Sequence, residues 1–219
     1  MDERAPDSAF ISALTTEHFV LQSARGALIS EMVGRGNVYL SAVSSALIAF
    51  GFWAQLGTGI DLFVAAVLPA LFIFGELTFV ALVRSSLKNL EFMRRMQRIR
   101  GYYRTMHPDA EQFFDPSDAD REHAAELATV GMRPGLGSML FTGATSIAAV
   151  NSMLGAVGLA LLAGRVDGIQ GGVVVTIGIL AALALFGLHL LYERRRGVPS
   201  TPTTTLGAGA GEVRRQTEP

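Results

Sequence analysis

The chain has 219 residues, half of them apolar, and 17% of them are charged, against about 25% in an average soluble domain. Its 18 basic and 19 acidic residues gather in three stretches and leave four others almost uncharged, which is typical of a multi-pass membrane protein. The absence of cysteine excludes disulfides, thiolate nucleophiles and cysteine zinc sites.

The N-terminal segment, residues 1–36, is predicted to be cytoplasmic. Its first residues are polar and acidic with no apolar stretch behind them, so no cleaved signal peptide is expected. Residues 14–33 predict an amphipathic helix with an apolar stripe of Leu14, Leu21, Ala24, Leu28 and Met32. Thr15 or Thr16 is expected to cap it. The helix is predicted either to lie on the inner leaflet or to pack on a later cytoplasmic helix.

Four stretches are long and apolar enough to cross a hydrocarbon core, which takes about 20 residues of helix. They are residues 37–56, 62–83, 138–163 and 173–192. The last two have almost no polar face, whereas helices buried in a soluble bundle alternate apolar and polar faces. The predicted fold class is therefore all-α and integral membrane, with four transmembrane helices.

The basic residues predict the orientation of these spans. Of the 18 lysine and arginine residues, 17 lie in the N-terminal segment, the central loop and the tail, and only Arg165 lies on the opposite side. Basic flanks stay in the cytoplasm, so both termini and the loop are expected to face inward. The two outer turns are short, which predicts two antiparallel transmembrane hairpins, residues 37–83 and 138–192.

The central loop, residues 84–137, is predicted to form a cytoplasmic hairpin of a basic helix and an acidic helix. Span two lacks a strong breaker before His107, so it is expected to continue into the cytoplasm as one helix. Residues 109–126 carry seven acids against one arginine, which predicts a second helix attracted to the first. No nucleic-acid partner is expected, because the basic helix is tethered at the membrane.

Anionic lipids of the inner leaflet are the expected partners of the basic residues that flank the spans. The predicted head-group anchors are Arg84, Lys88, Arg94, Arg95, Arg194, Arg195 and Arg196. The segment 193–219 is rich in Thr, Pro and Gly without an apolar period, which predicts a disordered cytoplasmic tail beyond the last anchors.

Glu76 is the only charged residue among residues 62–83. A carboxylate in hydrocarbon costs about 2.5–3.5 kcal/mol, so it is expected to face the bundle interior or water. Its expected partners are hydroxyls at similar depth on spans one and three: Ser41, Ser44, Ser45, Thr142, Thr145 and Ser146.

The candidate intramembrane polar site therefore comprises Glu76, Asn151, Ser45 and Thr145. Asn151 is expected to form an interhelical hydrogen bond, and His189 to anchor span four near the inner interface. Two interpretations of Glu76 remain open: a proton- or cation-responsive site on a conduction path, or a structural hydrogen bond between the two hairpins.

No enzyme, metal or cofactor is expected. The sequence holds no zinc-protease, nucleophile-elbow, phosphate-loop or dinucleotide motif, so no catalytic residue is assigned. The acids around Asp115 do not match a calcium loop, because the required spacing is missing and Pro116 interrupts them.

Several short stretches of the first half stand out: Thr16–Phe19, Gln22, Ala24-Arg25, Glu31, Gly34-Arg35, Tyr39–Ser41, Ser44–Leu47 and Arg98–Arg104. They resemble a group of uncharacterised multi-pass membrane proteins from actinobacteria. The resemblance implies a bacterial plasma (inner) membrane location and no particular activity. The layout of a two-span hairpin continued by a cytoplasmic helix is also loosely similar to SLATT-type effectors, which implies pore formation by analogy of architecture alone.

The leading functional hypothesis is a non-enzymatic membrane protein that forms homo-oligomers and an ion-permeable path, with Glu76 facing its interior. One alternative is a scaffold or sensor whose cytoplasmic helices, residues 84–135, recruit a soluble protein. The other is an accessory subunit of a transporter.

Overall fold

A computed structural model of the chain describes residues 8–56, 60–107, 109–110, 113 and 143–197. These residues form four helices: α1 (Ser8–Leu56), α2 (Ile60–Arg104), α5 (Gly143–Ala163) and α6 (Gly171–Gly197). No strand occurs among them, and all four helices are long and apolar enough to cross a membrane. The prediction of an all-α protein with four candidate spans is confirmed.

α1 is a single helix of 49 residues that joins the predicted amphipathic helix to the first predicted span. Thr15 and Thr16 lie inside it, and their hydroxyls donate to the carbonyls of Ile11 and Ser12. The prediction that one of them caps the helix is wrong, because the helix already begins at Ser8. A threonine inside a helix satisfies its hydroxyl on the preceding turn instead.

α2 is likewise one helix of 45 residues, which contains Pro69 and continues well past the second predicted span. The continuation into the basic segment was expected from the unbroken apolar pattern. A proline is tolerated inside a membrane helix, since neighbouring helices and local adjustments satisfy the freed carbonyl.

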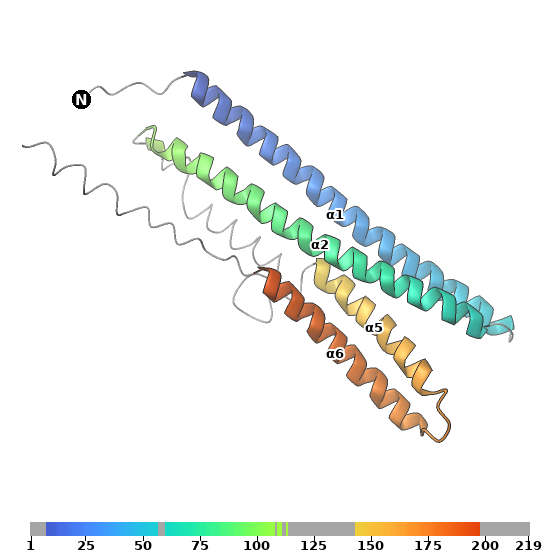
Figure 1. The fold of residues 1–219 in the computed structure, drawn as a ribbon. Coiled ribbons are helices and arrows are strands. Elements are labelled where there is room, and N and C mark those ends of the chain that lie inside the picture. Colours follow the sequence, from blue (N-terminus) through green and yellow to red (C-terminus); the bar gives the residue numbers. More distant parts are fainter. Residues whose placement is uncertain (1–7, 57–59, 108, 111–112, 114–142, 198–219) are drawn as a thin grey trace, which may run out of the picture.

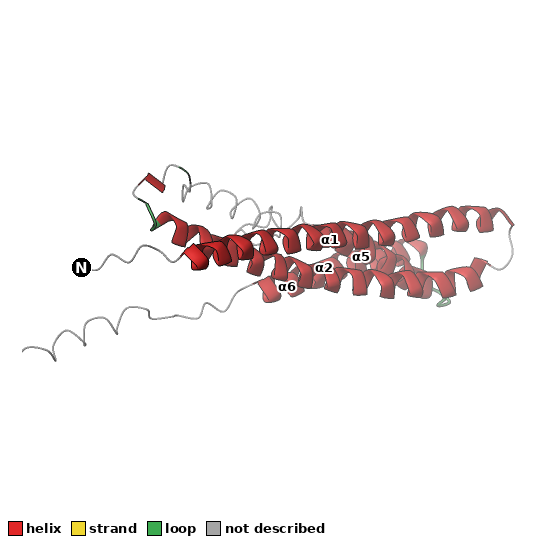
Figure 2. Cartoon of the chain, turned by 90° about the horizontal axis from the view of Figure 1, so that it is seen from above, coloured by secondary structure: helices red, strands yellow, loops and turns green. Residues whose placement is uncertain are grey.

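All four helices pack together in one part of the molecule, and only α1 and α2 continue beyond it (Figure 1, Figure 2). α1 lies beside α2 over most of its length, α5 packs on both α2 and α6, and α1 and α6 make only minor contacts outside these pairs. α1 and α2 extend together past the ends of α5 and α6. We call this extension, residues 8–28 and 87–104, the arm, and the remainder the four-helix part.

The arm has an apolar core of its own. Leu21 of α1 packs against four buried residues of α2: Leu90, Met93, Met96 and Ile99. Beside this core, Arg25 Nε donates to Asn89 Oδ1 at 3.1 Å. Of the two positions predicted for residues 14–33, the structure therefore has the one in which their apolar stripe packs on the continuation of the second predicted span.

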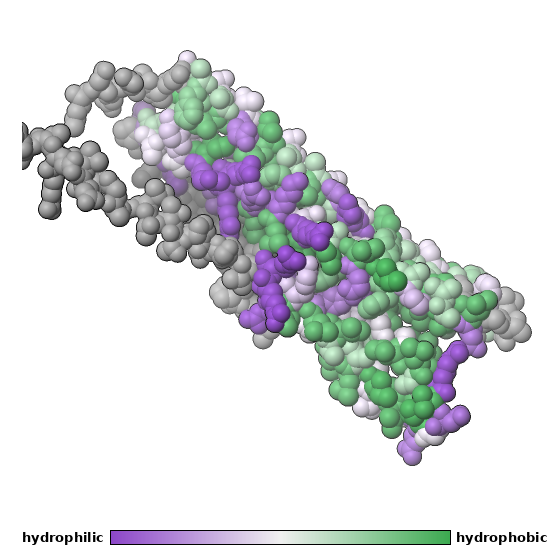
Figure 3. Space-filling view, in the orientation of Figure 1, coloured by the Kyte–Doolittle hydropathy of each residue, from purple (hydrophilic) through white to green (hydrophobic). Residues whose placement is uncertain are grey.

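The surface of the four-helix part is largely apolar (Figure 3). In the most apolar 18-residue windows of α1 and α6, only 11% and 6% of the residues are buried. Hydrophilic residues gather along the arm on the face shown. An apolar surface this extensive is unusual for a soluble monomer, and together with the four candidate spans it suggests a membrane protein.

Some predicted segments lie outside the described residues. They include residues 114–142, with most of the predicted acidic helix and Thr142, and residues 198–219 of the predicted tail. Residues 193–197, which were assigned to the tail, belong to α6.

Candidate functional site

Four polar side chains, one from each helix, meet inside the four-helix part. Tyr39 Oη of α1 donates to Asn151 Oδ1 of α5 at 3.1 Å, and Asn151 Nδ2 donates to Glu76 Oε1 of α2 at 3.0 Å. His189 Nε2 of α6 lies 3.0 Å from the same Glu76 oxygen. We call these four residues the polar cluster. It joins helices whose contributing residues are up to 150 positions apart in the sequence.

The members of the polar cluster differ in their exposure. Tyr39 and Asn151 are fully buried, and the His189 side chain is 5% exposed, whereas that of Glu76 is 37% exposed. Glu76 therefore lies at the edge of the cluster, where its Oε1 contacts the enclosed side chains of Asn151 and His189.

The second ring nitrogen of His189 has a hydrogen-bonding partner in its own helix. Nδ1 lies 2.7 Å from the carbonyl oxygen of Leu185, which can only accept, so Nδ1 carries a proton. The contact between Nε2 and Glu76 Oε1 then needs one further proton. A hydrogen bond at this contact places one proton between the imidazole and the carboxyl group.

Two neighbours position the imidazole ring. Phe79 packs edge to face against it at a centroid distance of 4.6 Å. Ser152 Oγ lies 3.4 Å from Nδ1 and donates to the carbonyl of Ala148 at 2.7 Å. The ring is thus held by α2 and α5 as well as by its own helix.

Gly75 makes room for the cluster. A β-carbon at this position would overlap the amide of Asn151 and approach the Tyr39 hydroxyl to 2.8 Å. Any side chain here would therefore displace two of the four cluster residues. The glycine that precedes Glu76 in the sequence lets α2 approach α1 and α5 closely enough for the hydrogen bonds to form.

The other two residues of the predicted polar site lie elsewhere. Ser45 is exposed on α1. Thr145 is buried, but its hydroxyl donates to Glu193 Oε2 of α6 at 3.3 Å instead of to Glu76. This second contact joins α5 and α6 near the basic end of α6.

The serines that were expected to bond to Glu76 do not belong to the polar cluster either. Ser41, Ser44 and Ser45 are exposed, and Ser44 Oγ donates to Leu40 of its own helix. At 3.6 residues per turn they lie about 140–240° around the helix axis from Tyr39, which faces α5. Ser146 is also exposed. The hydroxyl that α1 contributes is the phenol of Tyr39.

Two cluster residues were missed or misread in the sequence. Tyr39 lies near the start of the predicted first span, where a tyrosine is usually an interfacial anchor. His189 was expected to be such an anchor, but it is buried and points at Glu76. The available signal was that Tyr39, Glu76 and His189 each lie within about two turns of the end of their apolar stretch that is nearer a basic segment.

The predicted lipid anchors are all exposed. Arg84 and the run 194–196 lie near the boundary of the four-helix part, and the Arg196 guanidinium stands over the Tyr192 ring at 5.5 Å. Arg94 and Arg95 lie about 15 Å farther along α2 than Arg84, at 1.5 Å per residue. Arg95 pairs there with Glu91 at 2.5 Å.

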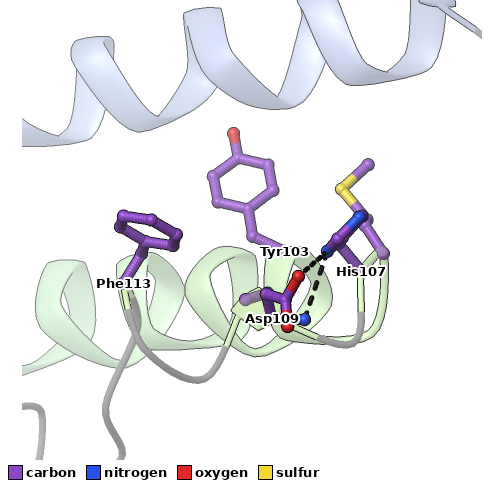
Figure 4. A pocket seen from close by; sticks show the side chains of 6 residues that line it. Tyr103, His107, Asp109 and Phe113 are labelled. Atoms are coloured by element: carbon purple, nitrogen blue, oxygen red, sulfur yellow. Dashed lines mark hydrogen bonds and ion pairs between the residues drawn. The ribbon is translucent and has the colours of Figure 1, made fainter.

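An open pocket lies at the tip of the arm (Figure 4). Its walls include Tyr103, Phe113 and His107, whose Nδ1 accepts a hydrogen bond from the backbone N–H of Asp109 at 3.1 Å. Both His107 and Asp109 are largely exposed. Within the described part of the chain, no group of three or more histidine or acidic side chains could hold a metal ion.

Comparison of the chain with protein-family models, with curated proteins and with solved structures finds no match.

Proposed function

We propose that this chain is a non-enzymatic multi-pass protein of a bacterial plasma membrane, in which the polar cluster is a proton- or cation-responsive site on an ion-permeable path. Insertion is supported by the four long apolar helices and their outward apolar faces. In this proposal α1 with α2 and α5 with α6 are two transmembrane hairpins. The arm and both termini are cytoplasmic, since almost all basic residues flank that side.

The observation that carries the proposal is the contact of 3.0 Å between His189 Nε2 and Glu76 Oε1. Ionisable residues inside membrane spans mark ion or proton paths, because their burial in hydrocarbon is otherwise unfavourable. Glu76 precedes Arg84 by eight residues, which places it about 12 Å inside the proposed cytoplasmic boundary. An acid and a base that share one proton at this depth can pass it on when water or a cation reaches them.

The surroundings of the cluster support a path that is polar on one side and closed on the other. Toward the cytoplasmic end, Thr145 and Glu193 form the next buried polar contact, one turn from His189. In the opposite direction, the next turns of α1, α2 and α5 contribute Val43, Leu71 and Leu154. These residues line the closed end of an apolar cavity, and in this proposal the apolar layer closes the path because it excludes water.

A homo-oligomer is part of the proposal. The Glu76 side chain is 37% exposed in a single copy, and contact of a charged carboxylate with hydrocarbon costs about 2.5–3.5 kcal/mol. A second copy packed over this face would cover it and would enclose the path.

The test is ion and proton flux into liposomes that contain the purified chain. Glu76→Gln keeps an oxygen that accepts from Asn151 but cannot share a proton with His189. It is expected to lower flux at least about tenfold, equivalent to roughly 1.4 kcal/mol in barrier height. Glu91→Gln, an exposed change on the same helix, is the control and should conduct like wild type. Absence of flux in all three proteins would contradict the proposal.

A second candidate function is a scaffold that recruits a cytoplasmic protein, and the arm favours it. The arm is held by its own core, and its basic residues Arg94 and Arg98 are exposed well beyond the proposed boundary. Head groups at the membrane surface would not reach them, whereas an acidic soluble protein would. An accessory role in a larger transporter would use the same surface.

This alternative predicts a charge-dependent partner. The double variant Arg94→Glu, Arg98→Glu should lose a protein that co-purifies with the full-length chain, because the attraction to an acidic surface is reversed. Arg195→Glu, an exposed change at the end of α6, should retain it. The measurement is quantitative mass spectrometry of cross-linked membranes, and equal recovery from all three proteins would argue against recruitment by the arm.

A further inference from the structure

An apolar cavity of about 650 Å³ lies in the half of the four-helix part that is farther from the arm. All four helices contribute to its walls, with Leu47 and Phe50 from α1, Leu68 from α2 and Val157 from α5 among them. Its size is within the range of about 300–1,000 Å³ that is usual for small-ligand sites. Its walls offer few hydrogen-bonding groups to water, so an apolar occupant is favoured.

One ion pair stands at the rim of this cavity. Arg165, in the connection between α5 and α6, donates to Asp61 Oδ1 in the first turn of α2 at 2.6 Å. Both side chains are well exposed, at 65% and 81%. Exposed ion pairs contribute little to stability. The contact between Arg165 and Asp61 can therefore be replaced at little cost by contacts with the charged groups of a ligand.

The depth of the cavity matches the length of one lipid acyl chain. It extends along α2 from Asp61 at the rim to Leu71 at the floor, which is about 15 Å at 1.5 Å per residue. This is half of a hydrocarbon core about 30 Å thick. With the helices inserted as proposed above, the rim lies at the level of the head groups and the floor near the middle of the bilayer.

We propose that the cavity holds an acyl chain of a zwitterionic, amine-bearing phospholipid, whose phosphate binds Arg165 and whose ammonium binds Asp61. Such a head group carries the same two charges as the ion pair it replaces. An anionic lipid would leave Asp61 beside a phosphate without a cation, and a quaternary ammonium cannot donate a hydrogen bond to the Asp61 carboxylate. The inference rests on the membrane insertion proposed above and does not depend on ion permeation.

The experiment is native mass spectrometry of the full-length chain, delipidated in detergent and titrated with phosphatidylethanolamine, phosphatidylcholine or phosphatidylglycerol of the same acyl composition. One phosphatidylethanolamine per chain is expected to bind most tightly. Val157→Trp fills the cavity and should weaken this binding about tenfold or more. Leu162→Trp is the matched control, because Leu162 is exposed on the same helix and outside the cavity walls.

A second variant tests the head-group contact without altering the interior. Asp61→Asn removes the partner of the ammonium and should abolish the preference for phosphatidylethanolamine over phosphatidylcholine, while Arg165→Gln should weaken both. Equal binding of the three lipids to wild type, or full retention by Val157→Trp, would overturn the inference. Release of the chain from membranes by alkaline carbonate would instead contradict the proposed insertion, and absent flux with lipid bound would contradict only permeation.

Discussion

Gly75→Ala is expected to destabilise the folded protein by about 1–3 kcal/mol, the usual effect of overpacking a filled interior. The added methyl group would overlap the amide of Asn151, which is held at one end by Tyr39 and at the other by Glu76. Because the amide cannot move without breaking one of these hydrogen bonds, relaxation around the new side chain is restricted. The measurement is thermal unfolding in detergent micelles.

Gly187→Ala is the matched control. Gly187 lies in α6 two residues before His189, and a β-carbon there would meet no atom within 4 Å. Alanine is favoured over glycine in a helix by about 0.8–1.0 kcal/mol, so this variant should be as stable as wild type or more stable. Equal melting temperatures for the two variants would mean that the close approach at Gly75 does not limit the packing of α2.

The sequence was sufficient to predict the number and type of the helices. Long apolar stretches and the unbroken pattern after residue 83 depend only on local composition, and they gave the four candidate spans and the continuation of α2. The sequence predicted an amphipathic helix and a separate first span, because hydropathy changes near Asn37. The structure has one helix from Ser8 to Leu56.

The polar cluster was less predictable, because the contacts of a side chain depend on how each helix is rotated about its axis. Glu76 and Asn151 were both singled out, but the serines proposed on α1 as partners of Glu76 are exposed, and the cluster contains Tyr39 and His189 instead. That rotation is set by close packing at positions such as Gly75, which an alanine- and glycine-rich sequence does not distinguish from other glycines.

Asn151→Ala is expected to have the other large effect, because Asn151 is the residue through which α1, α2 and α5 are joined. It is fully buried, accepts from Tyr39 and donates to Glu76. Its removal leaves the Tyr39 hydroxyl enclosed without an acceptor and deprives Glu76 of a donor. Glu76 keeps its contact with His189, so one buried group is left without a partner, which corresponds to a loss of about 1–3 kcal/mol in the free energy of unfolding, measured with a reversible denaturant in micelles.

A double-mutant cycle separates this cooperative effect from the loss of packing volume. Tyr39→Phe removes only the hydroxyl, so in combination with Asn151→Ala it should add little, with a coupling energy of about 0.5–3 kcal/mol. The hydroxyl of Thr145 bonds to Glu193. The free-energy changes of Tyr39→Phe and Thr145→Ala should therefore add within about 0.5 kcal/mol when the two are combined. Additivity of Tyr39→Phe and Asn151→Ala as well would mean that apolar contacts, such as those of Phe79, Ile147 and Ala148, hold α1 against α5. The hydrogen bond between Tyr39 and Asn151 would then contribute little to the stability of the fold.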